Sequence, residues 1–160
     1  MSYELMQFDG MIVAGLSIRT DNQKASREIP LFWKKVFQDD ILTKIPHAAS
    51  GYVYGVYSDY ESDQKGAYSL TGGIEVEQSE ELPEGLVVRQ IPAGIYAVFT
   101  AHGPEELVNT WKAIWKSGLE RTYKFDFEEY GAEDQSVRIY IGVDGEDQPD
   151  IECPEPRCCC

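Results

Sequence analysis

The stretch LVNTWKAIWK, residues 107–116, decides the predicted fold, because LFWKKVF, residues 31–37, repeats its pattern. Each stretch contains Trp-Lys, with apolar residues three and four positions after the tryptophan. In a helix this spacing collects the apolar side chains into one stripe. The sequence therefore predicts two amphipathic helices, over about residues 24–38 and 104–119. Pro30 is expected to start the regular part of the first helix, because proline is tolerated in a first turn.

Strand-like runs surround the two helices in the same order, one run before each helix and two after it. They are rich in β-branched and aromatic residues, and several of them alternate apolar and polar positions. The predicted strands are residues 11–18, 51–58 and 67–76 around the first helix, and 94–100, 121–130 and 136–143 around the second.

A strand, helix, strand, strand unit that is used twice predicts an α+β fold of duplicated βαββ units around a pseudo-twofold axis. The units span about residues 3–77 and 86–143. We expect an antiparallel sheet, two main helices and a central ligand groove at the seam between the units. Residues 1–143 would then form a single domain, since a chain of 160 residues has the length of one ordinary domain.

The remaining segments are acidic. Residues 77–85 are interpreted as a linker between the repeats, and residues 144–160 as a flexible tail that contains prolines. The body of the chain has no cysteine, which fits a reducing compartment. Neighbouring cysteines without paired C-x-x-C motifs are a poor zinc pattern, so we predict neither a metal site nor a cofactor. The four cysteines all lie in the tail, at Cys153, Cys158, Cys159 and Cys160.

The chain carries 28 Asp and Glu against 14 Lys and Arg, a net charge of −14. Affinity for nucleic acids comes largely from Lys and Arg that neutralise phosphates, so no direct nucleic-acid binding is predicted. The same charge favours cationic partners through long-range attraction, and it also favours solubility. The N-terminus lacks the basic start and apolar run of a signal peptide, and no stretch is long enough to span a bilayer. We therefore expect a cytoplasmic protein with no membrane partner.

Two adjacent glycines, Gly72 and Gly73, stand within a predicted strand. Such glycines either allow another backbone or a ligand to approach closely, or mark a β-bulge. The bulge is the preferred interpretation.

No familiar catalytic motif is present: the sequence has no G-x-S-x-G, no Walker-type loop, no H-E-x-x-H and no dinucleotide fingerprint. His47 and His102 are single and far apart in the sequence, and they are interpreted as ordinary histidines. A serine or cysteine hydrolase is therefore not expected.

What remains is a high number of tyrosines, ten in all, together with many carboxylates. Aromatic rings at the seam, with one buried carboxylate, would hold a flat or lipophilic cation by stacking, cation–π attraction and charge pairing. For any single aromatic residue, ordinary packing in the sheet is the alternative. The tyrosines expected at the seam are Tyr52 or Tyr54, Tyr68, Tyr96 and Tyr140.

In the order and spacing of its pieces, the chain resembles the GyrI-like small-molecule-binding domain, which is the effector-binding domain of AraC-type and MerR-type multidrug regulators. The resemblance covers residues 1–143, and each piece alone is weakly specific. It rests on the strand pair 52–57 and 68–76, the segment IPAGIYAVF at 91–99, the turn and helix at 102–115, the Phe-Glu-x-Tyr pattern at 127–130, and the strand 137–143.

This resemblance implies a duplicated βαββ fold with a ligand groove at its pseudo-twofold axis. It also implies that Glu128, the Glu of the Phe-Glu-x-Tyr pattern, meets cationic ligands, with Glu129 as the alternative if the register slips by one. Gly142 stands where the family usually has Pro, and Gly118 stands where Trp is expected. These departures predict that the end of the second helix is shaped differently from that of the family. The candidate ligand-binding residues are Glu128, Tyr52, Tyr54, Tyr68, Tyr96, Trp111, Trp115 and Tyr140.

Three functions follow from these features. The leading hypothesis is a stand-alone module that binds lipophilic, cationic small molecules, as a drug sensor or a sequestering protein. The second is a hydrolase of electrophilic, cyclopropanoid-type toxins, as the resemblance implies, with Glu128 as general base and Tyr96 in support. The third is an acidic, DNA-mimicking inhibitor of a DNA-handling enzyme. A homodimer, a separate regulator and a basic protein partner stay open.

Overall fold

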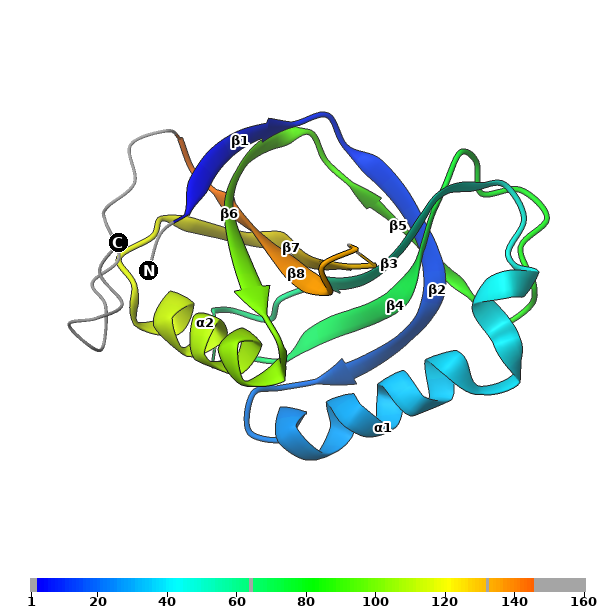
Figure 1. Cartoon of the computed structure of the whole chain (residues 1–160), viewed down its shortest axis with the longest axis horizontal. Helices are drawn as coiled ribbons and strands as arrows, with labels where there is room; N and C mark the ends of the chain where they lie inside the picture. Colours follow the sequence, from blue (N-terminus) through cyan, green and yellow to red (C-terminus); the bar gives the residue numbers. More distant parts are fainter. Residues whose placement is uncertain (1–2, 64, 132, 146–160) are drawn as a thin grey trace.

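The computed structural model of the protein describes residues 3–63, 65–131 and 133–145. The predicted tail, with its four cysteines, lies outside the described residues from residue 146 onward. No described helix has the length and apolar character needed to cross a membrane. In chain order the elements are β1 (Glu4–Phe8), β2 (Met11–Thr20), α1 (Ala25–Phe37), a 3-10 helix η1 (Gln38–Lys44), β3 (Ala48–Ser58), β4 (Tyr68–Val76), β5 (Val87–Ile91), β6 (Gly94–His102), α2 (Pro104–Lys116), β7 (Arg121–Tyr130) and β8 (Ser136–Val143) (Figure 1).

All eight strands join one sheet in the order β1-β6-β8-β7-β3-β4-β2-β5, and every neighbouring pair is antiparallel. The two units, β2-α1-β3-β4 and β6-α2-β7-β8, meet where β3 pairs with β7. The predicted α+β fold of duplicated βαββ units is therefore confirmed. The strand that precedes each unit in the chain pairs with a strand of the other unit: β1 pairs with β6, and β5 pairs with β2.

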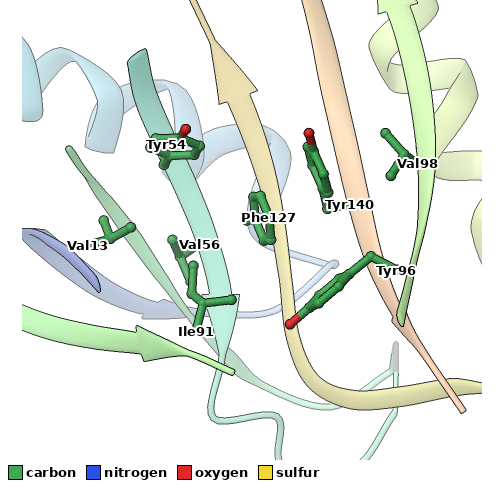
Figure 2. Packing of buried hydrophobic residues seen from close by; sticks show 8 residues of the cluster. All are labelled: Val13, Tyr54, Val56, Ile91, Tyr96, Val98, Phe127 and Tyr140. Carbon is green, nitrogen blue, oxygen red and sulfur yellow. The ribbon is translucent and has the colours of Figure 1, made fainter. Parts of the chain in front are cut away.

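The sheet is curled, and α1 and α2 both lie on one of its faces (Figure 1). We call this the helix face and the opposite one the far face. On the helix face, Phe32 and Val36 of α1 pack with Leu70 of β4, and Ile114 of α2 packs with Phe99 of β6. The far face has its own buried cluster, shown in Figure 2: Val13, Tyr54, Val56, Ile91, Tyr96, Val98, Phe127 and Tyr140.

The helix α1 spans nearly the predicted residues, but its regular part begins before Pro30, where the sequence predicted it to start. Pro30 lies inside it, and the regular part already starts at Ala25. The side chain of Asp21 accepts hydrogen bonds from the backbone N–H groups of Gln23 and Lys24, which orders the chain ahead of the helix. The backbone N–H of Glu28 then bonds the Lys24 carbonyl at 2.9 Å. A local turn thus nucleates the helix upstream of the proline.

The helix α2 begins as predicted and ends sooner. Pro104 occupies its first turn behind Gly103, whose φ of 95° suits glycine, and the helix stops at Lys116 rather than at residue 119. The hydroxyl of Ser117 donates to the Ile114 carbonyl at 2.7 Å, and its backbone N–H donates to the same oxygen at 3.1 Å. These bonds close the last turn, which is why the chain leaves the helix at this serine.

The preferred interpretation of Gly72 and Gly73 as a bulge is wrong. Both residues lie in continuous register with β2 and β3, and the register shift of β3 falls between Ala48 and Val53 instead. A Cβ atom placed on Gly15 would lie 2.0 Å from the Gly72 carbonyl oxygen. The glycines therefore permit the close approach of two backbones, which was the alternative interpretation.

We expect Gly15→Ala to destabilise the protein by about 1–3 kcal/mol or more, because the added methyl group meets backbone atoms that cannot rotate away. Gly51→Ala is the matched control, since a Cβ there meets nothing within 4 Å. Urea unfolding followed by tryptophan fluorescence measures both variants. Equal midpoints for the two variants would contradict the close-approach interpretation.

Candidate functional site

A cavity of about 700 Å³ opens on the helix face between α1 and α2. Both helices line it, and the strands β3, β4 and β7 supply its remaining walls. Most of the lining side chains are apolar or aromatic. Among the residues that the structure describes, no group of three or more His, Cys, Asp or Glu side chains could hold a metal ion. The cavity walls are thus mainly apolar and aromatic, which is typical of small-molecule sites in proteins.

The carboxylate of Glu128 lies in this cavity, and the residue is only 3% exposed. Its position on β7 faces Gly55 of β3 across the sheet. A Cβ atom on Gly55 would lie 2.9 Å from the Trp33 ring and 3.3 Å from the Oε1 atom of Glu128. The missing side chain at Gly55 thus makes room for both the carboxylate and the indole of Trp33.

Three neutral groups donate hydrogen bonds to Glu128. The hydroxyls of Tyr57 and Tyr130 bond Oε1 at 3.1 and 2.8 Å, and the indole Nε1 of Trp111 bonds Oε2 at 2.7 Å. The ion pairs between described residues involve Asp21, Asp59 and Asp126, so Glu128 has no cationic partner there. The protein therefore holds this buried carboxyl group with neutral dipoles alone.

The electrostatics of the cavity follow from this arrangement. Burial raises the pKa of Glu128 above its ordinary value, while the three hydrogen bonds lower it and offset part of the shift. Burial and the nearby charge of Glu128 also raise the pKa of Tyr57 and of Tyr130. Both phenols thus stay protonated at neutral pH and remain donors to the carboxylate.

Aromatic rings from both repeats surround the carboxylate. Trp111 of α2 packs edge-on against Tyr57 with ring centroids 5.2 Å apart, and Trp33 of α1 does the same with Tyr130 at 5.6 Å. Tyr57 also contacts Tyr68, 5.6 Å away, and burial raises the pKa of Tyr68 to about 12. The two tryptophans that repeat in the sequence therefore contact the two tyrosines that bond the carboxylate.

Half of the predicted site residues line this cavity: Glu128, Tyr68, Trp111 and Trp115. Glu129, the alternative carboxylate, does not line it and accepts a hydrogen bond from the Tyr54 hydroxyl at 3.0 Å. Of the two candidate carboxylates, Glu128 is thus the one that lies in the cavity.

The other four tyrosines do not line the cavity, which corrects their predicted placement. Tyr54, Tyr96 and Tyr140 belong to the far-face cluster (Figure 2). Tyr96 donates to the Pro92 carbonyl at 3.0 Å, and the ring of Tyr140 stacks on Phe127 at 4.3 Å. Tyr52 is 38% exposed and packs against Tyr54. Side chains alternate between the two faces of a sheet. A tyrosine that lies an odd number of positions from Tyr57 or Glu128 on the same strand therefore points away from the cavity.

Among the cavity residues that sequence reasoning missed are three aromatic side chains near Glu128: Trp33, Tyr57 and Tyr130. Each had a signal. Trp33 is the counterpart of Trp111 in the first repeat, and Tyr130 shares a strand face with Glu128 because it lies two positions later. Tyr57 points to the opposite face of β3 from Tyr54 and Val56, and the sequence does not show which of these faces the helices cover.

Comparisons with known proteins agree with this fold. The chain is 35% identical over 145 residues to YobU of Bacillus subtilis (strain 168), a protein named as a transcriptional regulator, with 81% of this chain and 90% of that protein covered. An integron cassette protein from the mobile metagenome of Vibrio cholerae has a similar structure, with a TM-score of 0.71 and 25% identity, over 89% of this chain and 95% of that one.

SAV2435, whose structure was solved bound to tetraphenylphosphonium, also has a TM-score of 0.71, with 19% identity over 91% of this chain and 95% of that chain. At this identity the likeness shows the fold alone. The family Cass2, described as "Integron-associated effector binding protein", matches residues 4–143. The resemblance to effector-binding domains that the sequence suggested is confirmed, and the chain belongs to the Cass2 family of integron-associated effector-binding proteins.

Proposed function

We propose that the protein binds lipophilic organic cations in the cavity between α1 and α2, with Glu128 as the counter-charge. One observation carries the proposal: a buried carboxylate, held by three neutral donors, lies in an aromatic cavity without a cationic partner among the described residues. Residues 1–143 would form the binding module. The naming of a relative as a transcriptional regulator supports a role in sensing the ligand or in sequestering it.

The charge of Glu128 gives the cavity its selectivity. Taking a carboxylate out of water costs several kcal/mol, and neutral hydrogen bonds offset only part of this free energy. A bound cation supplies the missing opposite charge in a region of low dielectric constant, whereas a neutral ligand of the same shape does not. An anion is repelled. The binding free energy should therefore depend strongly on the sign of the ligand's charge.

The aromatic walls suit a cation that is also lipophilic. Trp33, Trp111 and Tyr57 offer ring faces and edges around the carboxylate, and indole rings are the best partners for cation–π attraction. A volume of about 700 Å³ accommodates a molecule the size of a drug. Tetraphenylphosphonium, the ligand in the SAV2435 structure, is a cation of this class, which supports the choice of ligand.

The hydrolase hypothesis is weaker than the binding hypothesis. It relied on Tyr96 to support Glu128, and the Tyr96 hydroxyl instead donates to the Pro92 carbonyl on the far face. A tyrosine that assists the reaction must lie within hydrogen-bond reach of the reacting groups, and Tyr96 lies on the other face of the sheet from Glu128. The DNA-mimic hypothesis stays a prediction, and salt-sensitive binding to a basic protein would be its test.

Tetraphenylphosphonium and tetraphenylborate have the same shape and opposite charge, so they test the proposal directly. We expect the phosphonium to bind and the borate to bind at least about a hundredfold more weakly, since unit charges about 5 Å apart interact by roughly 3 kcal/mol at an effective dielectric constant of about 20, and repulsion adds to the difference. Glu128→Gln should weaken phosphonium binding by about 10- to 100-fold. Tryptophan fluorescence and calorimetry measure the affinities.

Glu129→Gln is the matched control for this titration. The residue neighbours Glu128 in sequence but bonds Tyr54 on the far face. Its phosphonium affinity should equal that of the wild type. The proposal fails if wild type does not bind the phosphonium, or if both Gln variants lose the same affinity.

The raised pKa of Glu128 also predicts how stability depends on pH. The folded protein holds the proton more tightly than the unfolded chain, whose value is near the ordinary 4.5. The contribution of Glu128 to stability is therefore greatest below pH 4.5 and is lost as pH rises through the folded pKa, after which it is constant. Glu128→Gln removes this loss, because an amide can donate to the two phenols while it accepts from Trp111.

The variant without ligand should therefore be more stable than the wild type at neutral pH, and its advantage should grow as pH rises from 4.5 to the folded pKa of Glu128 and stay constant above it. Urea unfolding over a series of pH values measures the difference. A difference between the two proteins that stays constant with pH would show that the buried carboxylate is not the source.

A further inference from the structure

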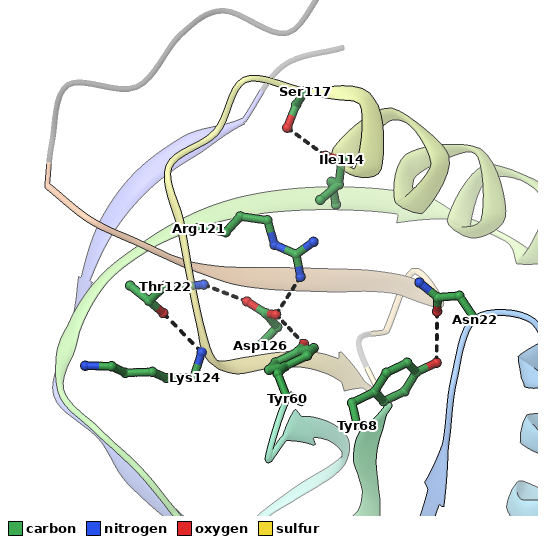
Figure 3. A network of polar contacts seen from close by, with 10 residues as sticks. Asn22, Tyr60, Tyr68, Ile114, Ser117, Arg121, Thr122, Lys124 and Asp126 are labelled. Atoms are coloured by element: carbon green, nitrogen blue, oxygen red, sulfur yellow. Dashed lines mark hydrogen bonds and ion pairs between the residues drawn. The ribbon is translucent and has the colours of Figure 1, made fainter. Parts of the chain in front are cut away.

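A second buried polar cluster lies at the beginning of β7. The guanidinium Nη2 of Arg121 bonds the Oδ2 of Asp126 at 2.8 Å, and their side chains are 3% and 0% exposed. Asp126 also accepts hydrogen bonds from the Tyr60 hydroxyl and, at 2.9 Å, from the backbone N–H of Gly142 (Figure 3). Both carboxylate oxygens of Asp126 are therefore bonded within the protein.

The guanidinium of Arg121 is not satisfied in the same way. Its Nε and Nη1 atoms are buried and have no hydrogen-bond partner among the described residues. Figure 3 shows one terminal nitrogen turned to Asp126 and the other turned away from it. The ring of Tyr123 lies 4.4 Å from the guanidinium carbon and holds the group in place by cation–π attraction, but it accepts no hydrogen bond from either nitrogen.

A purely structural pair does not account for these two donors. Buried polar groups in proteins are nearly always hydrogen-bonded, and leaving a charged donor without an acceptor is unfavourable. Arg121 is also one of the residues that line the cavity containing Glu128. The missing acceptor can therefore come from the occupant of that cavity.

The two charged groups lie within the length of one small molecule. Asp126 and Glu128 share a face of β7 in continuous register with β3, and residues two apart on a strand are about 7 Å apart. The side chain of Asp126, to which the guanidinium is bonded, therefore lies about 7 Å along the strand from that of Glu128. The cavity presents a group that needs a cation beside a group that needs an acceptor.

We propose that the ligand is an organic cation that also carries an oxygen acceptor, a carbonyl, ester or carboxylate oxygen, a few bonds from its positive centre. Glu128 pairs with the positive centre and Arg121 donates to the oxygen. A carboxylate is the strongest such acceptor, because its bond with a guanidinium is charge-assisted on both sides. This inference rests on the proposed function, since it concerns the same cavity.

Two phosphonium salts of nearly equal size test the inference: pentyltriphenylphosphonium and (4-carboxybutyl)triphenylphosphonium. They differ in whether the alkyl arm ends in a methyl group or in a carboxylate. Wild type should bind the carboxybutyl compound at least about tenfold more tightly, as expected for one charge-assisted hydrogen bond. Calorimetry at neutral pH gives both dissociation constants.

Two variants assign this preference. Arg121→Met alone leaves Asp126 as a buried, unpaired charge, so it is combined with Asp126→Asn, whose amide can still bond Tyr60 and Gly142. In this double variant the preference should vanish while the affinity for the pentyl compound is retained. Lys112→Met is the control, because Lys112 is an exposed cation that also lines the cavity, and this variant should keep the wild-type preference.

The outcomes separate the two proposals. If wild type binds the pentyl compound and does not prefer the carboxybutyl compound, the acceptor subsite is wrong and the cation-binding function stands. Loss of the preference in Lys112→Met would also overturn it, because the surface lysine would then be the source. If neither compound binds, both proposals fail. The wild-type preference, kept in Lys112→Met, supports the subsite even if the double variant does not fold.

Discussion

The cost of removing one carboxylate from water governs the arrangement of this protein's cavity. Glu128 is buried beside no cation, and it is tolerated because Tyr57, Tyr130 and Trp111 direct three dipoles at it. These donors come from β3, β7 and α2, so elements from both repeats must be in place before the charge is stabilised. The aromatic rings that exclude water are therefore the same groups that supply the hydrogen bonds. The proposed selectivity for cations and the packing of the cavity thus depend on one set of side chains.

Much of the fold could be predicted from local patterns. The repeated Trp-Lys stripes indicated both helices, and alternation indicated the strands, because periodicity reports which side chains share a face. The regular turn of α1 ahead of Pro30 was missed since it depends on the turn at Asp21, whose side-chain bonds are a matter of local geometry rather than of periodicity. The close approach at Gly72 was missed because a glycine pair is compatible with a bulge as well.

The site was harder to predict for a physical reason. Alternation shows that Tyr54 and Tyr57 point to opposite faces, but it does not show which face the helices cover. Both faces of the central strands are buried here, so Tyr54 and Tyr57 are equally apolar in their surroundings and neither is marked as a wall of the cavity. Glu128 was found because the Phe-Glu-x-Tyr pattern resembles a family. Arg121 was missed because its position depends on the register shift between Arg121 and Asp126 where β7 pairs with β8.

The exchange of outer strands between the repeats also bears on how the chain must fold. Glu4 pairs with Val98, so β1 has no place in the sheet until β6 exists, and the edge of β2 stays open until β5 covers it. Contacts between residues so far apart in sequence slow folding, because a long loop must close before they form. During synthesis the first repeat is therefore an unfinished sheet with an exposed strand edge, which is a template for wrong pairing. The second half of the chain therefore protects the first half from wrong pairing, because it supplies the strands that complete the sheet.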